Sequence, residues 1–243
     1  MEHPLKGKTA IVTGASEGYG VGIAKVLIDA GARVWITARR QSLLEDVGER
    51  IGATPVCADV CSSEDWDRVF DSVLSAAGRI DILVNNAGAG IAIKEMADMT
   101  DEAIRKIIDI NLTGAALGCR RAAKAMKEQG SGTIVNVGSV CAVQAWPGFA
   151  AYAAAKAGLV LLTRSLYVEL RPHGARATSV IPSWGDTGFA KAVGLPGKPP
   201  EVAAKCTKPE ELGKIILDVC TLPPHLAIQE MIVWPTVQEV VPL

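Results

Sequence analysis

The feature that most constrains this chain is a strand, a glycine-rich turn and a helix in immediate succession at residues 9–30. Residues 9–13 form a short apolar run of the kind that is buried in a parallel sheet. Gly14, Gly18 and Gly20 follow directly, and residues 21–30 carry apolar side chains at helical spacing. This order places a helix N-terminus beside backbone that a ligand can approach closely, which suits a pyrophosphate. An ordinary tight turn is the alternative, but the flanking strand and helix are the context that a phosphate site requires.

Later segments continue the alternation of strand and helix. Apolar runs predict strands at residues 33–37, 54–58, 80–85, 176–181 and 228–234, with a further strand ending just before Ser139, and helical spacing predicts helices at 62–77, 101–129 and 150–171. Asn111 and Gly114 are poor residues for the interior of the second of these helices, which favours a functional kink there, although a long helix can also carry a satisfied asparagine. Asp59 can cap the helix at 62–77.

Composition narrows the class of function. The 243 residues fit one α/β domain, and no linker marks a boundary. The net charge of -1 provides no field for nucleic acid or an anionic membrane. No signal peptide is recognisable, and no apolar run approaches the roughly 18 residues that cross a bilayer, so a cytoplasmic protein is expected. The six cysteines include no Cys-x-x-Cys pair and the three histidines are isolated, so no metal site is predicted.

A tyrosine and a lysine in the helix at 150–171 indicate acid and base chemistry. Tyr152 and Lys156 are four residues apart and therefore share one helical face. A phenol has a pKa of about 10, and an adjacent ammonium that favours phenolate would make tyrosine a usable acid and base near neutrality. The hydroxyl of Ser139, at the tip of a strand, could hold a carbonyl oxygen beside that phenol.

These motifs occur in one order along the chain: Thr13-Gly14-x-x-x-Gly18-x-Gly20, Asn85-Asn86-Ala87-Gly88, Asn111, Ser139 and Tyr152-x-x-x-Lys156. Together they resemble the short-chain dehydrogenase/reductase family over nearly the whole chain. The resemblance implies a single Rossmann domain with a doubly wound, seven-stranded parallel sheet, a nicotinamide cofactor, and hydride transfer to or from a carbonyl carbon.

The resemblance also implies roles for individual residues. Ser139 would hold the substrate oxygen, Tyr152 would transfer the proton, and Lys156 would lower the phenol pKa and bind the nicotinamide ribose. Asn111 would hold, through its backbone carbonyl, a water that leads to Lys156. The residues expected to bind the cofactor lie in the glycine turn, at strand ends and around the catalytic pair: Gly14, Ser16, Glu17, Gly18, Tyr19, Gly20, Arg39, Arg40, Asp59, Val60, Asn86, Ala87, Gly88, Tyr152, Lys156, Pro182 and Thr187.

Cofactor choice is expected to depend on the end of the second strand. NAD users generally place a carboxylate there, whereas this chain has Arg39 and Arg40. Arg39 offers a planar cation suited to a 2′-phosphate, which favours NADP(H) over NAD(H). Two solvated surface arginines are the alternative, and Glu17 is an opposing feature because a carboxylate in the turn could repel a phosphate.

The substrate side is predicted with less detail. Ser139, Val140, Gln144, Trp146, Tyr152 and Trp184 are expected to contact the substrate, although aromatic side chains at such positions are as often plain packing. Residues 186–205, with turn formers concentrated at 189–200, are predicted to be a mobile lid over a small substrate. Ser183 departs from the Pro-Gly that the family usually has at this turn. Lys94 and Lys191 could attract an anionic substrate, or could be solvated surface lysines.

Three other classes of protein are the alternatives to a small-molecule dehydrogenase. A serine hydrolase needs Gly-x-Ser-x-Gly with a downstream histidine and acid, and Ser139 has neither that context nor those partners. An NAD(P)-binding regulator without catalysis is the non-enzyme alternative, and a 3-oxoacyl thioester reductase is the enzymatic one.

Self-association is the last expectation. The helix at 150–171 is apolar on nearly every side, whereas a helix that packs only on its own sheet shows one polar face. Small residues at Ala151, Ala154, Ala155 and Gly158 would admit a second helix, and the apolar residues 228–234 and 240–243 offer another surface. Two different twofold contacts predict a homotetramer.

Overall fold

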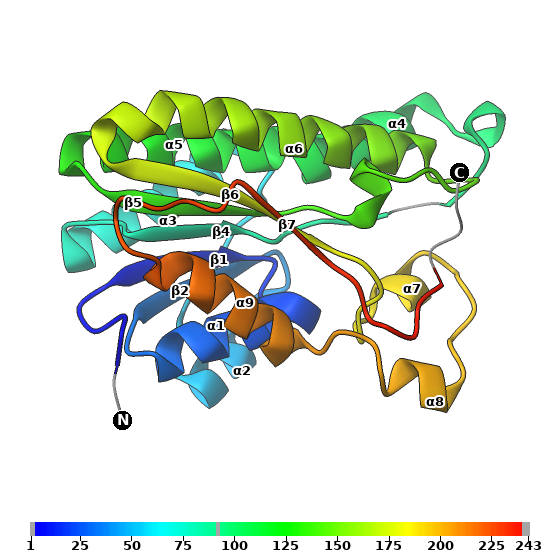
Figure 1. The fold of residues 1–243 in the computed structure, drawn as a ribbon, viewed down its shortest axis with the longest axis horizontal. Helices are drawn as coiled ribbons and strands as arrows, with labels where there is room; N and C mark the ends of the chain where they lie inside the picture. Colours follow the sequence, from blue (N-terminus) through cyan, green and yellow to red (C-terminus); the bar gives the residue numbers. More distant parts are fainter. Residues whose placement is uncertain (1–2, 91–92, 240–243) are drawn as a thin grey trace.

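The sheet is parallel throughout and has seven strands in the order β3-β2-β1-β4-β5-β6-β7 (Figure 1). The computed structural model describes residues 3–90 and 93–239. The strands are β1 (Thr9–Thr13), β2 (Arg33–Ala38), β3 (Thr54–Cys57), β4 (Ile82–Asn85), β5 (Gly132–Val137), β6 (Ala175–Pro182) and β7 (Glu230–Val233). Strand order reverses between β1 and β4, so the predicted doubly wound Rossmann sheet is confirmed.

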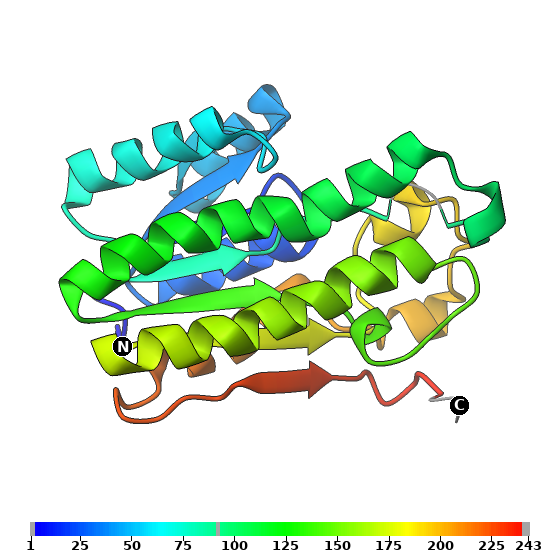
Figure 2. The same ribbon diagram turned by 90° about the horizontal axis from the view of Figure 1, so that it is seen from above.

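Helices cover both faces of the sheet, as Figures 1 and 2 show. They are α1 (Gly18–Asp29), α2 (Gln41–Ile51), α3 (Ser63–Ala77), α4 (Asp101–Ile108), α5 (Gly114–Gln129), α6 (Ala150–Leu170), α7 (Phe189–Ala192), α8 (Pro200–Ala203) and α9 (Pro209–Thr221). One core cluster joins α1, α2 and α9 to the sheet, and a second joins α3, α5 and α6 to the opposite face. None of the helices in the described residues is long and apolar enough to cross a membrane.

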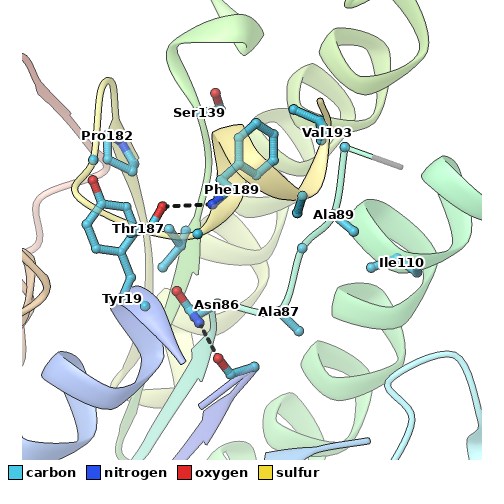
Figure 3. A pocket seen from close by; sticks show the side chains of 18 of the residues that line it. Tyr19, Asn86, Ala87, Ala89, Ile110, Ser139, Pro182, Thr187, Phe189 and Val193 are labelled. Atoms are coloured by element: carbon cyan, nitrogen blue, oxygen red, sulfur yellow. Dashed lines mark hydrogen bonds between the residues drawn. The ribbon is translucent and has the colours of Figure 1, made fainter. Parts of the chain in front are cut away.

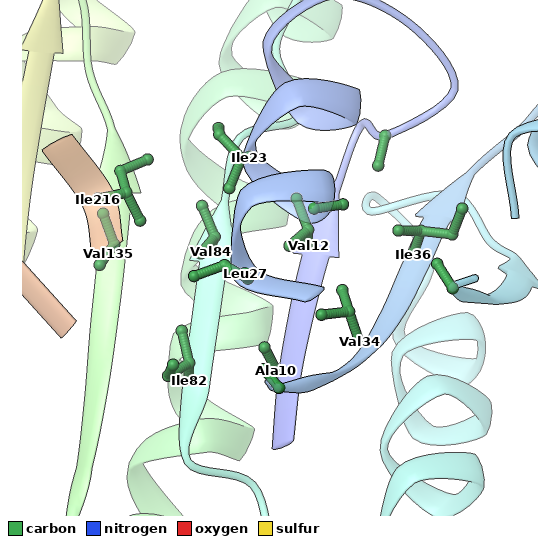
Figure 4. Packing of buried hydrophobic residues seen from close by; sticks show 14 of the residues in the cluster. Ala10, Val12, Ile23, Leu27, Val34, Ile36, Ile82, Val84, Val135 and Ile216 are labelled. Atoms are coloured by element: carbon green, nitrogen blue, oxygen red, sulfur yellow. The ribbon is translucent and has the colours of Figure 1, made fainter. Parts of the chain in front are cut away.

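Strand β1 shows why the sequence folds into two layers around the sheet. Successive side chains of a strand point to opposite faces, so Ala10 and Val12 lie in the cluster under α1 while Ile11 lies in the cluster under α3 and α5. All three are fully buried. Figure 4 shows Val12 packed with Ile23 and with side chains of neighbouring strands. A strand buried on both faces needs a continuous apolar run, and residues 9–13 supply it.

The helix predicted at 101–129 contains one π-helical turn, Asp109–Thr113, between α4 and α5. The backbone N–H of Gly114 bonds the carbonyl of Asp109, five residues earlier. Asn111 lies inside this turn and is 1% exposed. The expected irregularity around Asn111 is therefore present, as a π-bulge, which is frequent at functional sites.

Other boundaries differ in detail from the sequence prediction. Helix α1 begins at Gly18, because the second half of the glycine turn is already helical, and β7 is shorter than the predicted 228–234. Helix α3 is capped by the Ser62 hydroxyl, which accepts from the N–H of Asp65 at 3.1 Å. The cap is thus not Asp59, which instead accepts from the N–H of Cys61.

The outer layer of α4, α5 and α6 is relevant to self-association. Helices α5 and α6 lie side by side across the sheet in Figure 2, and α4 also packs on α6. On α6, Leu161 and Val168 are 61% and 62% exposed, but Arg164 and Ser165 lie between them on the same face and are also exposed, so the open face is mixed rather than wholly apolar. Two of the four small residues expected at that face, Ala151 and Ala155, are instead buried within the chain because they face its own core. Residues 240–243, also expected at an interface, lie outside the described residues.

Candidate active site

A cavity of about 760 Å³ opens at the carboxyl ends of the strands, where the strand order reverses (Figure 3). Its wall includes the glycine turn after β1, the ends of β2 and β4, the Ser139 segment after β5, and the segment after β6. In open α/β sheets, ligands bind at this position. Figure 3 shows Tyr19, Asn86, Ser139 and Phe189 around it, each from a different part of the chain.

Hydrogen bonds join the glycine turn to the end of β4. The Thr13 hydroxyl accepts from the N–H groups of Asn86 at 3.0 Å and Ala87 at 2.9 Å. In return the Asn86 side-chain amide donates to the carbonyls of Thr13 and Gly14, at 2.9 and 3.2 Å. These bonds fix the ends of β1 and β4, which meet where the strand order reverses. The position of Thr13 in the glycine motif did not predict this role.

The glycines allow this close approach. Gly14 has a φ of +66°, and a Cβ on it would lie 2.7 Å from the Cα of Ala87. A Cβ on Gly20 would lie 2.4 Å from the carbonyl oxygen of Gly14. Gly20 does not line the cavity, so the expected contact between Gly20 and a cofactor is corrected to an indirect role: its missing side chain lets the turn fold tightly. A turn packed in this way fits a pyrophosphate at the start of α1.

Ser139 follows β5 and begins a short 3₁₀ turn. Its hydroxyl oxygen accepts from the N–H of Cys141 at 3.2 Å. This bond orients the side chain and leaves its proton for donation into the cavity, which Ser139 lines together with Tyr152 and Lys156.

Tyr152 and Lys156 lie on the buried face of α6, at 8% and 3% exposure. The Lys156 ammonium donates to the carbonyl of Val137 at 2.9 Å and lies 5.8 Å from the centre of the Tyr152 ring. The Tyr152 ring also packs against Phe149 and Phe189, with ring centres at 6.3 and 5.7 Å. Phe189 belongs to α7, so the segment after β6 covers the catalytic tyrosine candidate.

This burial alters both pKa values. Desolvation raises the pKa of Tyr152 well above its usual range, and the neighbouring Ser139 hydroxyl offsets only part of this effect. Desolvation also lowers the pKa of Lys156 to about 8. The lowering of the phenol pKa expected from Lys156 does not appear in this arrangement, because desolvation is the largest influence on the pKa of Tyr152. A protonated phenol is the form that can donate a proton.

Asn111 acts through its side chain in this structure. Its amide nitrogen donates to the carbonyls of Ala89 at 2.7 Å and Ile107 at 2.9 Å, and its amide oxygen accepts from the N–H of Ala89 at 3.2 Å. Asn111 does not line the cavity. It holds the loop after β4 against the π-helical turn, and a Cβ on Gly88 would lie only 2.9 Å from its side-chain oxygen and 3.3 Å from the Lys156 nitrogen.

At the other end of the cavity, the carboxylate of Glu17 forms an ion pair with Arg40 at 2.9 Å. Arg40 also donates to the Ser16 hydroxyl at 3.1 Å. Arg39 lines the cavity as well and forms no ion pair with any residue of the described part of the chain. The negative charge that opposed an NADP assignment is therefore compensated by a neighbouring cation.

On the substrate side, Ser183 stands where the family usually has glycine, and its hydroxyl makes a hydrogen bond that glycine could not make. Its hydroxyl donates to the side-chain oxygen of Gln238 at 2.5 Å, and the N–H of Trp184 donates to the same oxygen at 3.1 Å. Gln238 is 8% exposed and lines the cavity, so the C-terminal segment contributes to the site. Residues 186–205, expected to be a lid, contain the two short helices α7 and α8, and their base is closed by backbone bonds between Thr207 and residues 184 and 186.

Most of the predicted site residues lie on the cavity wall. They are Gly14, Ser16, Glu17, Gly18, Tyr19, Arg39, Arg40, Asp59, Val60, Asn86, Ala87, Gly88, Ser139, Val140, Trp146, Tyr152, Lys156, Pro182, Trp184 and Thr187. Gly20, Asn111, Gln144, Lys94 and Lys191 do not line it; Gln144 lies beyond the turn that follows Ser139, and the two lysines are exposed. Cys141, Lys198 and Gln238 also line this wall, and no sequence motif marks them.

Comparisons with known proteins agree with this geometry. The family model described as short chain dehydrogenase matches residues 8–195. The human dehydrogenase/reductase SDR family member 4 is 31% identical over 230 residues, which cover 90% of this chain and 82% of that protein. A metagenomic short-chain oxidoreductase solved with NADP has a TM-score of 0.83 and 32% identity, covering 97% and 100% of the two chains. A 3-ketoacyl-(acyl-carrier-protein) reductase from Brucella melitensis, solved with NADH, has a TM-score of 0.86 and 31% identity, covering 94% and 97%.

Proposed function

The chain belongs to the short-chain dehydrogenase/reductase family of oxidoreductases, and we propose that it transfers a hydride between NADP(H) and the carbonyl or alcohol carbon of a small substrate. The observation that carries this proposal is the convergence of Ser139, Tyr152 and Lys156 on a cavity that the glycine turn also lines. Gly14 and Gly18 line the cavity at the start of α1, and Gly14 packs too closely on Ala87 for a side chain, which supports a nicotinamide cofactor whose pyrophosphate meets this turn.

The proposed chemistry assigns one task to each side chain. A bound nicotinamide supplies the hydride at its C4. Ser139 donates a hydrogen bond to the substrate carbonyl oxygen, which polarises the carbonyl toward attack at carbon. Tyr152 then transfers its phenolic proton to that oxygen, so that C–H and O–H bonds replace the carbonyl π bond. In alcohol oxidation, tyrosinate accepts the proton, and Lys156, held by the Val137 carbonyl, stabilises that anion.

A substitution at Tyr152 tests this assignment. Tyr152→Phe keeps the ring packing on Phe149 and Phe189 and removes only the hydroxyl. We expect turnover of aldehydes, ketones and 3-oxoacyl thioesters to fall by about 10²–10⁴-fold, with NADPH binding by fluorescence titration retained. Near-normal turnover in this variant would refute the proton-transfer role. NADPH binding without turnover of any compound by the wild type would favour a regulator.

The preference for NADP(H) rests on the arginines after β2. Arg39 is available to a 2′-phosphate, and the Glu17 charge is paired with Arg40. We expect Arg39→Ala to lower kcat/KM for NADPH by about ten- to hundredfold, the value of one or two charge-assisted hydrogen bonds, with little effect on NADH. A wild-type preference for NADH that persists in Arg39→Ala would overturn the assignment.

We also propose a homotetramer in which α6 contributes to one twofold interface. The exposed Leu161 and Val168 support it, because contact with a partner helix would remove their apolar surface from water. The double variant Leu161→Glu/Val168→Glu should lower the mass found by light scattering. Wild-type protein that is fully active at its monomer mass of 25.5 kDa would contradict the proposal.

A further inference from the structure

The charges on the cavity wall are unevenly distributed. Four of the charged lining residues, Glu17, Arg39, Arg40 and Asp59, belong to the glycine turn and the ends of β2 and β3, where the adenosine end of a dinucleotide would bind. Lys156 is buried beside Tyr152. The remaining charged residue on the described wall is Lys198, which lies between α7 and α8. Among the described residues, the part of the cavity wall supplied by the segment after β6 therefore carries one cation, Lys198, and no carboxylate.

Lys198 is held in a defined position. Its ammonium lies 5.0 Å from the ring centre of Trp184, within the range of a cation–π interaction. Within residues 3–90 and 93–239, no carboxylate lies within 4.0 Å of this ammonium. The ring occupies one side of the ammonium, so its other N–H donors remain available to a ligand.

The backbone of Trp184, whose ring forms the platform for Lys198, is held by two hydrogen bonds. The N–H of Trp184 donates to Gln238, and its carbonyl accepts from the N–H of Thr207 at 3.0 Å. One bond comes from the C-terminal segment and the other from the residue that closes the base of the segment after β6. Both bonds are independent of any ligand, so the backbone that carries the ring is preorganised.

Apolar residues precede Lys198 along the segment after β6. Phe189, Val193 and Leu195 of this segment line the cavity, and Phe189 packs directly on Tyr152. A substrate whose carbonyl meets Ser139 and Tyr152 would therefore pass an apolar surface before it reaches the ammonium. Such a surface favours an apolar chain and disfavours a polar one.

We propose that Lys198, supported by Trp184, forms an anion subsite, and that the substrate is an aldehyde or ketone that carries a carboxylate separated from its carbonyl by an apolar segment. This inference rests on the proposed function and adds a substrate class to it. It replaces the expectation that Lys94 or Lys191 attracts an anionic substrate, since neither lines the cavity.

The experiment compares oxoalkanoates of increasing chain length with their methyl esters, which keep the carbonyl and lose the charge. For the wild type, we expect kcat/KM to be higher for the acid than for the ester at the optimal length, and the preference to shrink as salt is added. In Lys198→Ala the acid-to-ester ratio of kcat/KM should fall about three- to tenfold, the range for one partly exposed charged contact. Trp184→Leu should lower the ratio in the same direction, and Lys198→Arg should largely restore it.

Matched controls come from the chain itself. Lys94→Ala and Lys191→Ala remove the same charge from neighbouring surface positions and should leave the ratio unchanged. A fall as large as that of Lys198→Ala would show a general field effect and overturn the subsite. Equal kcat/KM for acids and esters in the wild type would also overturn it, while leaving the proposed function standing.

A binding measurement separates the two proposals. Saturated alkanoates have no ketone or aldehyde carbonyl to reduce, and calorimetry should detect their binding to the wild type and about three- to tenfold weaker binding to Lys198→Ala. Alkanoate binding that depends on Lys198, together with no turnover of any carbonyl compound, would refute the proposed function and support the anion subsite. Alkanoate binding equal in the two proteins would refute the subsite alone.

Discussion

Replacing Lys156 by methionine should change the pH dependence of stability as well as abolish activity. Lys156 is 3% exposed, and its pKa is lowered from 10.5 to about 8 by desolvation. At about 1.36 kcal/mol per pH unit, this difference corresponds to about 3 kcal/mol of unfavourable free energy when the folded protein carries the charge. Methionine has similar length and no charge, so Lys156→Met removes this term.

The sign follows from proton binding. At pH 7 Lys156 is protonated in both states, and the wild type carries the whole cost of the buried charge. Between pH 8 and 10.5 the unfolded chain binds more protons than the folded one, so wild-type stability rises with pH relative to the variant. The lost bond to the Val137 carbonyl lowers the stability of the variant by about 1–3 kcal/mol at each pH, which leaves the slope unchanged.

We therefore expect the stability of Lys156→Met, relative to the wild type, to fall by about 2–3 kcal/mol between pH 7 and pH 10. For a chain of this size this corresponds to a change of roughly 5–10 °C in the difference between the two Tm values. Urea unfolding monitored by circular dichroism measures it directly. Lys124→Met, the same replacement at an exposed position on α5, is the control and should show a constant difference. Parallel stability curves for the wild type and Lys156→Met would refute the reasoning.

Two further substitutions test the turn and the sheet. Gly20→Ala places a Cβ 2.4 Å from the Gly14 carbonyl oxygen, so we expect a loss of about 1–3 kcal/mol in the free energy of unfolding and a roughly tenfold weaker Kd for NADPH. Gly197→Ala, with open space around it, is the control and should be neutral, and unchanged NADPH affinity in Gly20→Ala would contradict the turn geometry. Asp81 is 5% exposed, and although burial raises its pKa, bonds from Arg79, the Thr9 N–H and Lys8 hold that pKa below its ordinary 3.8. Asp81→Asn should therefore cost about 2–4 kcal/mol at pH 7, and the difference should shrink as the pH falls below 3.8, because that contribution is present above the unfolded-state pKa and is lost in acid; a difference that does not depend on pH would count against the ion-pair account.

Local pattern and motif order were sufficient for the fold. Strand β1 needs an apolar run because it is buried on both faces, and that requirement is visible in five residues. The π-helical turn was also foreseen in outline, because Asn111 and Gly114 conflict with a regular helix. Tyr152 and Lys156 could be paired from sequence because helical spacing alone places them on one face.

The sequence could not give the electrostatics of that pair. The lowered phenol pKa was expected from the proximity of an ammonium, but the burial of Tyr152 depends on neighbours such as Phe149 and Phe189, which pack against its ring. Phe189 lies on α7, and its position is fixed by the path of the chain after β6 rather than by any local pattern. Desolvation is a property of the assembled site, so its effect on the pKa of Tyr152 appears only in three dimensions.

The sequence by itself determined the strands of the sheet, the glycine turn and the placement of Tyr152 and Lys156 on one helix face, because each depends on spacing along a single segment. Tertiary structure alone decided which lysine on the substrate side lines the cavity, Lys198 rather than Lys94 or Lys191. It also decided that Gln238 is the hydrogen-bond partner of Ser183. Gln238 reaches Ser183 across 55 residues because β7 pairs with β6 and brings the C-terminal segment to the mouth of the site. Contacts of this kind depend on strand order and loop path, which no local periodicity encodes.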